Sequence, residues 1–158
     1  MKIKNRNQES GRSMVEIVGV LAIMGLLTAA AFALIQSGMT SQKMSKTADE
    51  INILVENVRA ISGEKGDFSN LPASCGSSNT SGKMLAAAIL DPDNNNNTVT
   101  ATMGGTFMIC KDASDSNAFF ISIYNMKSKY DCQMMEARAY SGGTATCSGK
   151  TLSIRYTK

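Results

Sequence analysis

The feature that most constrains the fold is an apolar stretch near the N-terminus, residues 14–36, which reads MVEIVGVLAIMGLLTAAAFALIQ. As a helix, this stretch would be about 34 Å long, enough to cross a hydrocarbon core of about 30 Å. Glu16 is its one ionisable residue, and a charge at the centre of a bilayer costs about 2.5–3.5 kcal/mol. The stretch therefore predicts a single membrane-spanning helix whose carboxylate needs a partner.

The residues before this stretch indicate its orientation. Residues 1–11 are basic and polar, with Lys2, Lys4 and Arg6 against Glu9, and basic flanks stay on the cytoplasmic side. A secretory signal has a shorter apolar region followed by a small-residue cleavage site. Here the best-placed small residue, Gly11, comes before the apolar stretch. We therefore expect a single-pass chain with its C-terminal domain outside the cytoplasm.

A helical pattern continues beyond the apolar stretch. Apolar residues recur in steps of four, three, four and three, at Met44, Ala48, Ile51, Val55 and Val58, which is one amphipathic stripe. No proline occurs within residues 12–62, and Gly63 is suited to end a helix. The pattern predicts one helix over 12–62, apolar all round in its first half and packed against a domain in its second.

Residues 63–158 predict a small globular α+β head domain. Strand composition occurs at 106–110, 118–124 and 151–158, and helical composition at 83–90 and 129–140. Residues 91–105 suggest an exposed loop or a frayed edge strand, and 141–150 a loop. In the last strand, Leu152, Ile154 and Tyr156 share one face. We expect a long N-terminal α-helix packed against a small antiparallel β-sheet.

The four cysteines, Cys75, Cys110, Cys132 and Cys147, contain no C-x-x-C pair. An even number of cysteines downstream of a membrane segment is typical of disulfides formed in an oxidising compartment. Four reduced thiols in a cytosolic protein are the alternative. Four cysteines allow three connectivities, and their spacing alone does not choose among them.

Composition argues against catalysis and against nucleic-acid binding. The chain has no histidine, so Ser-His-Asp and Cys-His catalysis are excluded and the commonest metal ligand is missing. The net charge is +3, and it falls to +1 without residues 1–11; a nucleic-acid-binding surface needs a basic patch. We predict a protein that is not an enzyme and that has no catalytic residue, metal site or cofactor.

Three short motifs carry little weight. Ser62–Lys65 matches the S-x-x-K of Ser-Lys hydrolases, but the companion S-D-N and K-T-G elements are missing. Residues 91–97 resemble the start of a calcium loop, yet Asn96 stands where glycine is required and Thr102 where glutamate is. Asn79 and Asn96 fit the glycosylation pattern N-x-[ST]. We interpret these motifs as a helix end and solvated loops.

The N-terminal pattern G-RSMV-E-IVGVLAIMGLLTAAAF resembles the type IV pilin family, whose class III signal has glycine, four residues, glutamate and then a hydrophobic helix. The resemblance implies cleavage by a prepilin peptidase between Gly11 and Arg12, leaving residues 12–158. In the family, the same enzyme usually methylates the new amino-terminus, here that of Arg12. The family commonly has Phe, Met or Leu at this position, so Arg12 is a departure that bears on methylation.

The resemblance also implies a role for Glu16. In the family, the corresponding glutamate pairs with the N-terminal amine of a neighbouring subunit. Here the pair would be Glu16 with the amine of Arg12, which would set the axial register of subunits leaving the membrane, since a buried charge persists only when paired. The alternative is that Glu16 extends from the end of a simple anchor helix towards water.

The C-terminal segments AFFISIYNMKSKYDCQMM and CSGKTLSIRYTK are similar to those of type IVb pilins. That resemblance implies a disulfide between Cys132 and Cys147, which leaves Cys75 to pair with Cys110. The leader is shorter and the head domain smaller than in those pilins.

Together, these resemblances imply a structural subunit of a type IV pilus, an inner-membrane precursor that becomes part of an extracellular filament. Its partners would be further copies of itself in a helical homopolymer, the prepilin peptidase and the inner-membrane assembly platform. Adhesion, motility, DNA uptake and conjugation all remain open as roles of the filament. Two alternatives are a pseudopilin of type II secretion and a single-span membrane-anchored enzyme or binding module.

Overall fold

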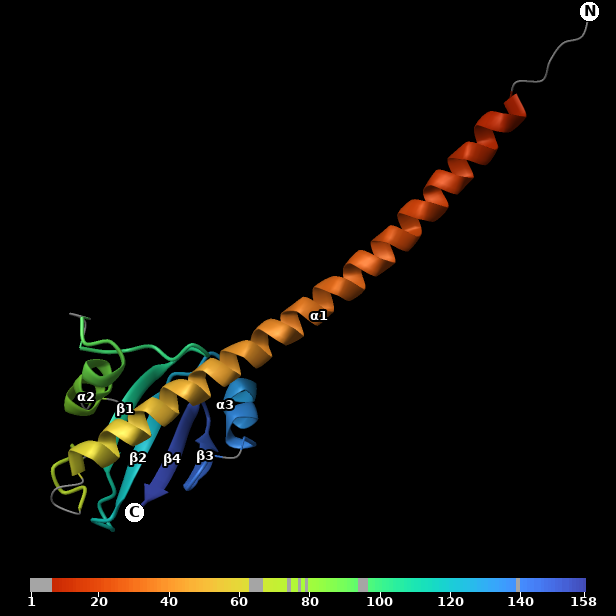
Figure 1. Cartoon of the computed structure of the whole chain (residues 1–158). Coiled ribbons are helices and arrows are strands. Elements are labelled where there is room, and N and C mark those ends of the chain that lie inside the picture. Colours follow the sequence, from red (N-terminus) through yellow and green to blue (C-terminus); the bar gives the residue numbers. More distant parts are fainter. Residues whose placement is uncertain are drawn as a thin grey trace, which may run out of the picture. The chain divides into compact units, whose positions relative to one another are not determined.

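The computed structural model describes residues 7–62, 67–73, 75, 76, 78, 80–93, 97–138 and 140–158, with the backbone alone for 7–13. Its elements are α1 (Asn7–Ser62), α2 (Thr80–Leu90), β1 (Thr106–Lys111), β2 (Ala118–Tyr124), α3 (Lys129–Glu136), β3 (Gly143–Ser148) and β4 (Thr151–Thr157), as Figure 1 shows. By its contacts, the chain divides into two compact units, Met1–Ser41 and Gln42–Lys158. The described part of the first unit is helix α1 alone. The second unit holds the remainder of α1 and all other elements, and we call it the head.

The sheet has four antiparallel strands in the order β1-β2-β4-β3. Its register aligns apolar residues in rows across the strands. Ile109 lies opposite Ile121, which in turn lies opposite Ile154. Because side chains alternate between the two faces of a strand, these rows make one face of the sheet apolar. The expected α+β arrangement of a long helix on a small antiparallel sheet is confirmed.

The C-terminal half of α1 crosses this apolar face, as seen in Figure 1. From the predicted stripe, Ile51, Val55 and Val58 are buried, and Leu54, outside that stripe, is buried beside them. The aromatic rings of Phe68, Phe119 and Tyr156 pack in series at the other end of the core, with centroid separations of 4.6 and 5.4 Å. The head therefore has one hydrophobic core between α1 and the sheet.

Polar contacts also attach α1 to the segment before β1. The Glu50 carboxylate accepts hydrogen bonds from the backbone N–H and the hydroxyl of Thr102, at 3.2 and 2.5 Å. The buried hydroxyl of Thr47 accepts one from the N–H of Met103 at 3.0 Å. These three bonds hold residues 102–103 against α1. The hydrophobic periodicity gave no sign of them, because hydrogen bonds between distant segments leave no local pattern.

The expected loop at 141–150 is wrong, because residues 143–148 form strand β3. Its sequence, GTATCS, alternates only between small side chains, so it lacks the bulky β-branched and aromatic residues that mark strands. Pairing with β4 along its whole length makes it a strand. Three helix boundaries also differ from expectation: α3 ends at Glu136, α2 begins at Thr80, and α1 already begins at Asn7. Gly63, expected to end α1, lies outside the described residues.

Candidate functional site

In the described part of the chain, the first half of α1 presents an exposed apolar surface. Every described side chain from Met14 to Met39 is exposed, and Met14, Leu26 and Leu34 expose 72%, 74% and 75% of their surface. The helix is long and apolar enough to cross a membrane, with a mean hydropathy of 2.5 in its most apolar window. An apolar patch of this size on a folded protein marks an interaction site with a membrane or another protein.

The hydroxyls of two threonines on this half of α1 are satisfied within the helix. The Thr28 hydroxyl donates to the carbonyl of Met24 at 2.7 Å, and that of Thr40 to the carbonyl of Gln36 at 3.1 Å. Each bond spans one helical turn, so neither hydroxyl requires water or a partner chain. The surface is thus compatible with a hydrocarbon environment despite its threonines.

Glu16 lies on this surface and is exposed. With Ile17, Val20 and Leu21 it lines a shallow hollow on the helix. Among the described side chains, those lining the hollow beside Glu16 are aliphatic and none is a cation. The side chains of Gly11 and Arg12, the expected cleavage and methylation site, lie outside the described residues. Any ion pair that Glu16 forms is therefore with a group the structure does not describe.

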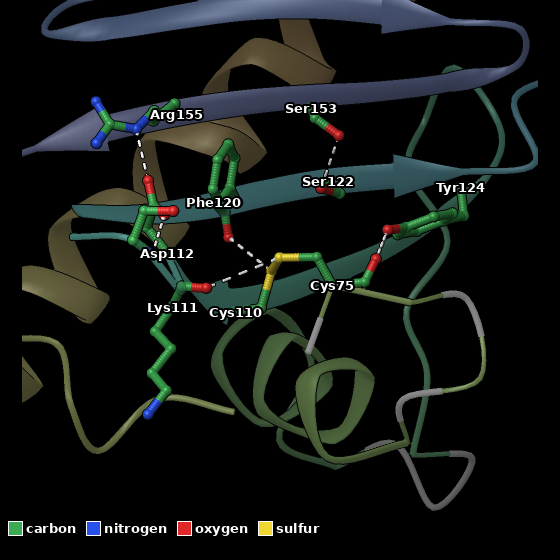
Figure 2. Close-up of a disulfide and its surroundings, with 10 residues drawn as sticks. Cys75, Cys110, Lys111, Asp112, Phe120, Ser122, Tyr124, Ser153 and Arg155 are labelled. Atoms are coloured by element: carbon green, nitrogen blue, oxygen red, sulfur yellow. Dashed lines mark hydrogen bonds and ion pairs between the residues drawn. A yellow bond between two sulfur atoms is a disulfide. The ribbon is translucent and has the colours of Figure 1, made fainter. Parts of the chain in front are cut away.

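The structure pairs Cys75 with Cys110 and Cys132 with Cys147, at Cα separations of 5.5 and 5.8 Å. These are the two pairs implied by the resemblance to type IVb pilins. Cys75–Cys110 ties the segment before α2 to β1, as Figure 2 shows. There, the hydroxyl of Tyr124 donates to the carbonyl of Cys75. Cys132–Cys147 joins α3 to β3.

Both edge strands of the sheet have backbone donors bonded to other segments of the chain. On β3, the N–H of Gly143 donates to the Tyr140 carbonyl at 3.1 Å, and the N–H of Cys147 to the Glu136 carboxylate at 3.0 Å. On β1, the N–H groups of Phe107 and Lys111 donate to the carbonyls of Val99 and Pro72, at 3.1 and 2.9 Å. Unpaired edge strands invite pairing with another chain. These four bonds occupy backbone donors that such pairing would need.

Helix α2 covers the middle of the β1 edge. A Cβ atom at Gly82 would lie 2.4 Å from the carbonyl oxygen of Ile109. Glycine at this position therefore allows the helix backbone to approach the strand closely. In the described part of the chain, α2 and the segments of Pro72 and Val99, all of which precede β1 in the sequence, thus occupy this edge.

The three weak motifs gain no support as sites. Ser62 of the S-x-x-K motif is buried, and Lys65 lies outside the described residues, as do Asn79 and Asn96. Within the described ranges, no group of three His, Cys, Asp or Glu residues is placed to hold a metal ion. The apolar half of α1, with Glu16, is thus the candidate site that the geometry favours.

Comparison of the chain with family models, with curated proteins and with solved structures gave no match.

Proposed function

We propose that the chain is a prepilin, an inner-membrane precursor that loses residues 1–11 and becomes a structural subunit of a type IV pilus. The observation that carries the proposal is the exposed apolar half of α1, with Glu16 as the one ionisable residue from Met14 to Ile35. Such a surface needs a bilayer before assembly and neighbouring helices after it. Glu16 follows Gly11 at the spacing of the prepilin signal.

In this proposal, cleavage after Gly11 supplies the missing partner of Glu16. Hydrolysis of the Gly11–Arg12 peptide bond creates an ammonium group on Arg12 that the precursor lacks. In the filament, this ammonium would face Glu16 of a neighbouring copy, with the Arg12 guanidinium as a second possible donor. Removing one partner of a buried ion pair costs about 3–5 kcal/mol, because the other charge stays buried. Subunits would therefore lock at the one axial register that pairs the charges.

The head supports assembly through α1 and not through its sheet. Both edge strands have backbone donors occupied by groups of the same chain. Addition of a strand from another subunit would have to break these bonds. In the proposed filament, α1 helices form the hydrophobic centre and the heads form the outer wall.

The test compares variants of Gly11 and Glu16 in the cells that make the protein. Gly11→Ala should retain the leader, visible as a larger mass, and should give no surface filaments. Glu16→Ala should be cleaved and inserted in the membrane but should assemble poorly, by tenfold or more given the cost above. Glu16→Asp, which keeps the charge, is the matched control and should assemble better than Glu16→Ala.

Other outcomes identify the alternatives. Normal filament yield from Glu16→Ala would defeat the register argument. A Gly11→Ala variant of unchanged mass and function would favour a membrane-anchored enzyme or binding module. Cleavage at Gly11 without long surface fibres, seen by electron microscopy, would favour a pseudopilin of type II secretion.

A further inference from the structure

One end of the head carries a group of exposed lysines. Thr47 and Glu50 of α1 bond to Met103 and Thr102, respectively. Gly104, the next residue, lies against Lys127, because a Cβ atom at Gly104 would be 3.7 Å from the Cβ of Lys127. Met126, which precedes Lys127 in the chain, donates its N–H to the carbonyl of Lys150 at 2.9 Å. These contacts place the start of α1 in the head, the β2–α3 connection and the β3–β4 turn at one end of the sheet.

We name the exposed lysines at this end the basic rim. Its members lie on α1, in the β2–α3 connection, at the start of α3 and in the β3–β4 turn: Lys43, Lys46, Lys127, Lys129 and Lys150. The acidic residues near them are Asp49, Glu50, Asp131 and Glu136. Two of these carboxylates are bonded, Glu50 to Thr102 and Glu136 to the N–H of Cys147. The rim therefore has an excess of positive charge.

An exposed aromatic residue lies beside the rim. Tyr130, next to Lys129 in the first turn of α3, exposes 68% of its surface. Tyrosine and tryptophan are enriched at membrane–water interfaces, where a ring with a polar group sits at the level of the lipid headgroups. Lysines combined with an interfacial aromatic residue are typical of surfaces that bind anionic membranes.

In the sequence, the first residues of the head follow the apolar stretch closely. Lys43 follows Gln36 by seven residues, about 10 Å of helix. If α1 spans a bilayer over 14–36, as the proposed function requires, the end of the head at which α1 enters is the end nearest the lipid. The opposite end of the sheet mixes both signs of charge: Arg155 pairs with Asp112 and Asp115 at 2.7 and 3.0 Å, and Lys111 ends strand β1.

We propose that the basic rim and Tyr130 bind anionic lipid headgroups while the subunit is in the membrane, holding the head on the bilayer surface before assembly. Each lysine near an anionic surface is worth about a fivefold gain in binding. The contact is electrostatic, so it weakens at high salt. This inference rests on the proposed membrane insertion of α1, but not on filament formation.

The chain has no tryptophan, so the fluorescence of a single introduced tryptophan can report on the contact between the head and the lipid. Full-length Tyr130→Trp is reconstituted into vesicles of phosphatidylcholine alone or with phosphatidylglycerol, each carrying lipids with a quencher in the headgroup. We expect several-fold stronger quenching in the anionic vesicles, lost at about 1 M salt, where the Debye length is about 3 Å. The matched control is Ala113→Trp, an exposed position at the opposite end, which should show little quenching in either lipid.

The lysines are tested on the same reporter. Adding Lys127→Gln, Lys129→Gln and Lys150→Gln to Tyr130→Trp leaves two of the five rim lysines and should strongly reduce the difference between the two kinds of vesicle. Equal quenching of Tyr130→Trp and Ala113→Trp would overturn the proposal, as would quenching unaffected by the three glutamines. A Tyr130→Trp signal that depends on protein density and not on lipid charge would instead assign the surface to contact between copies. Failure of the chain to float with the vesicles would refute membrane insertion, whereas floating without quenching would refute the lipid contact alone.

Discussion

At the scale of single residues, a few close contacts determine which substitutions the head tolerates. Gly143, the first residue of β3, is one of them. A Cβ atom there would lie 2.6 Å from Cε1 of Tyr156 and 2.9 Å from Cγ2 of Ile154. Both neighbours are buried, so neither has space to move away. The absence of a side chain at Gly143 is thus part of the packing of β3 on β4.

Gly143→Ala should therefore destabilise the head by about 1–3 kcal/mol, the usual cost of overpacking a close-packed core. The measurement is urea unfolding of the full chain in detergent, followed by the signal of the tyrosines. The matched control is Gly38→Ala in α1, where an added Cβ atom would meet nothing within 4 Å. This substitution should stabilise the helix by up to about 1 kcal/mol, because alanine has a higher helix propensity than glycine. Equal effects of the two substitutions would contradict the packing explanation.

Asp112 makes the stability of the head depend on pH. A hydrogen bond from Arg155 is the main cause that lowers the pKa of Asp112 below its usual 3.8. In the folded state the carboxylate therefore keeps its charge to lower pH than in the unfolded chain. Its contribution to stability is complete above about pH 3.8 and is lost as the pH falls through the lower folded pKa.

We expect Asp112→Asn to be less stable than the native chain near neutral pH, and the difference to disappear as the pH falls through the lowered pKa of Asp112. Thermal unfolding of the variant and the native chain at a series of pH values measures the difference in stability and its dependence on pH. Asp93→Asn, which removes a charge from an exposed position, controls for net charge. If the difference between Asp112→Asn and the native chain were constant over the whole pH range, the ion pair would not be its cause.

At the scale of elements, the two disulfides bind different segments to the sheet. Cys75–Cys110 closes a separation of 35 residues and Cys132–Cys147 one of 15. In the chain-entropy description, closing such loops stabilises the folded state by about 4 and about 3 kcal/mol. The head has few aromatic residues for its core, with 6% aromatics in the whole chain, so these contributions matter for a small domain.

Replacing Cys132 and Cys147 together by serine should therefore lower the unfolding free energy by about 3 kcal/mol, and replacing Cys75 and Cys110 by slightly more. Denaturant unfolding compares the two double variants with the native chain. Mass spectrometry of non-reduced peptides checks the pairing itself. A peptide joining Cys110 to Cys132 would show the pairing to be wrong.

At the scale of the whole molecule, the two compact units have different requirements. The buried residues of the described chain begin at Thr47, and the head unit begins at Gln42. The preceding part of α1 adds no buried residue from Met14 onward. The head thus contains its own core, both disulfides and the contacts of α1 with residues 102–103, whereas the apolar half of α1 has the length and composition of a membrane anchor.

A fragment of residues 42–158 should therefore fold by itself as a soluble monomer with both disulfides, and should form no filaments. Size-exclusion chromatography and circular dichroism test this directly. A fragment of residues 52–158 is the matched control. It lacks Thr47, Glu50 and Ile51, so it should unfold or aggregate, since a buried isoleucine and three hydrogen bonds are lost with them. Aggregation of the longer fragment would show that the head needs the first unit.

The sequence by itself determined the features that arise from local patterns. The apolar stretch with Glu16 follows from composition, and strand β2 coincides with its predicted range because AFFISIY is rich in aromatic and branched residues. Tertiary structure alone decided strand β3, the bonds of Glu50 and Thr47 with residues 102–103, and the hydrogen bonds at both sheet edges. The physical reason is that these depend on pairing and close approach between segments far apart in the chain. Small residues such as those of β3 carry no strong preference until a neighbouring strand supplies their hydrogen bonds.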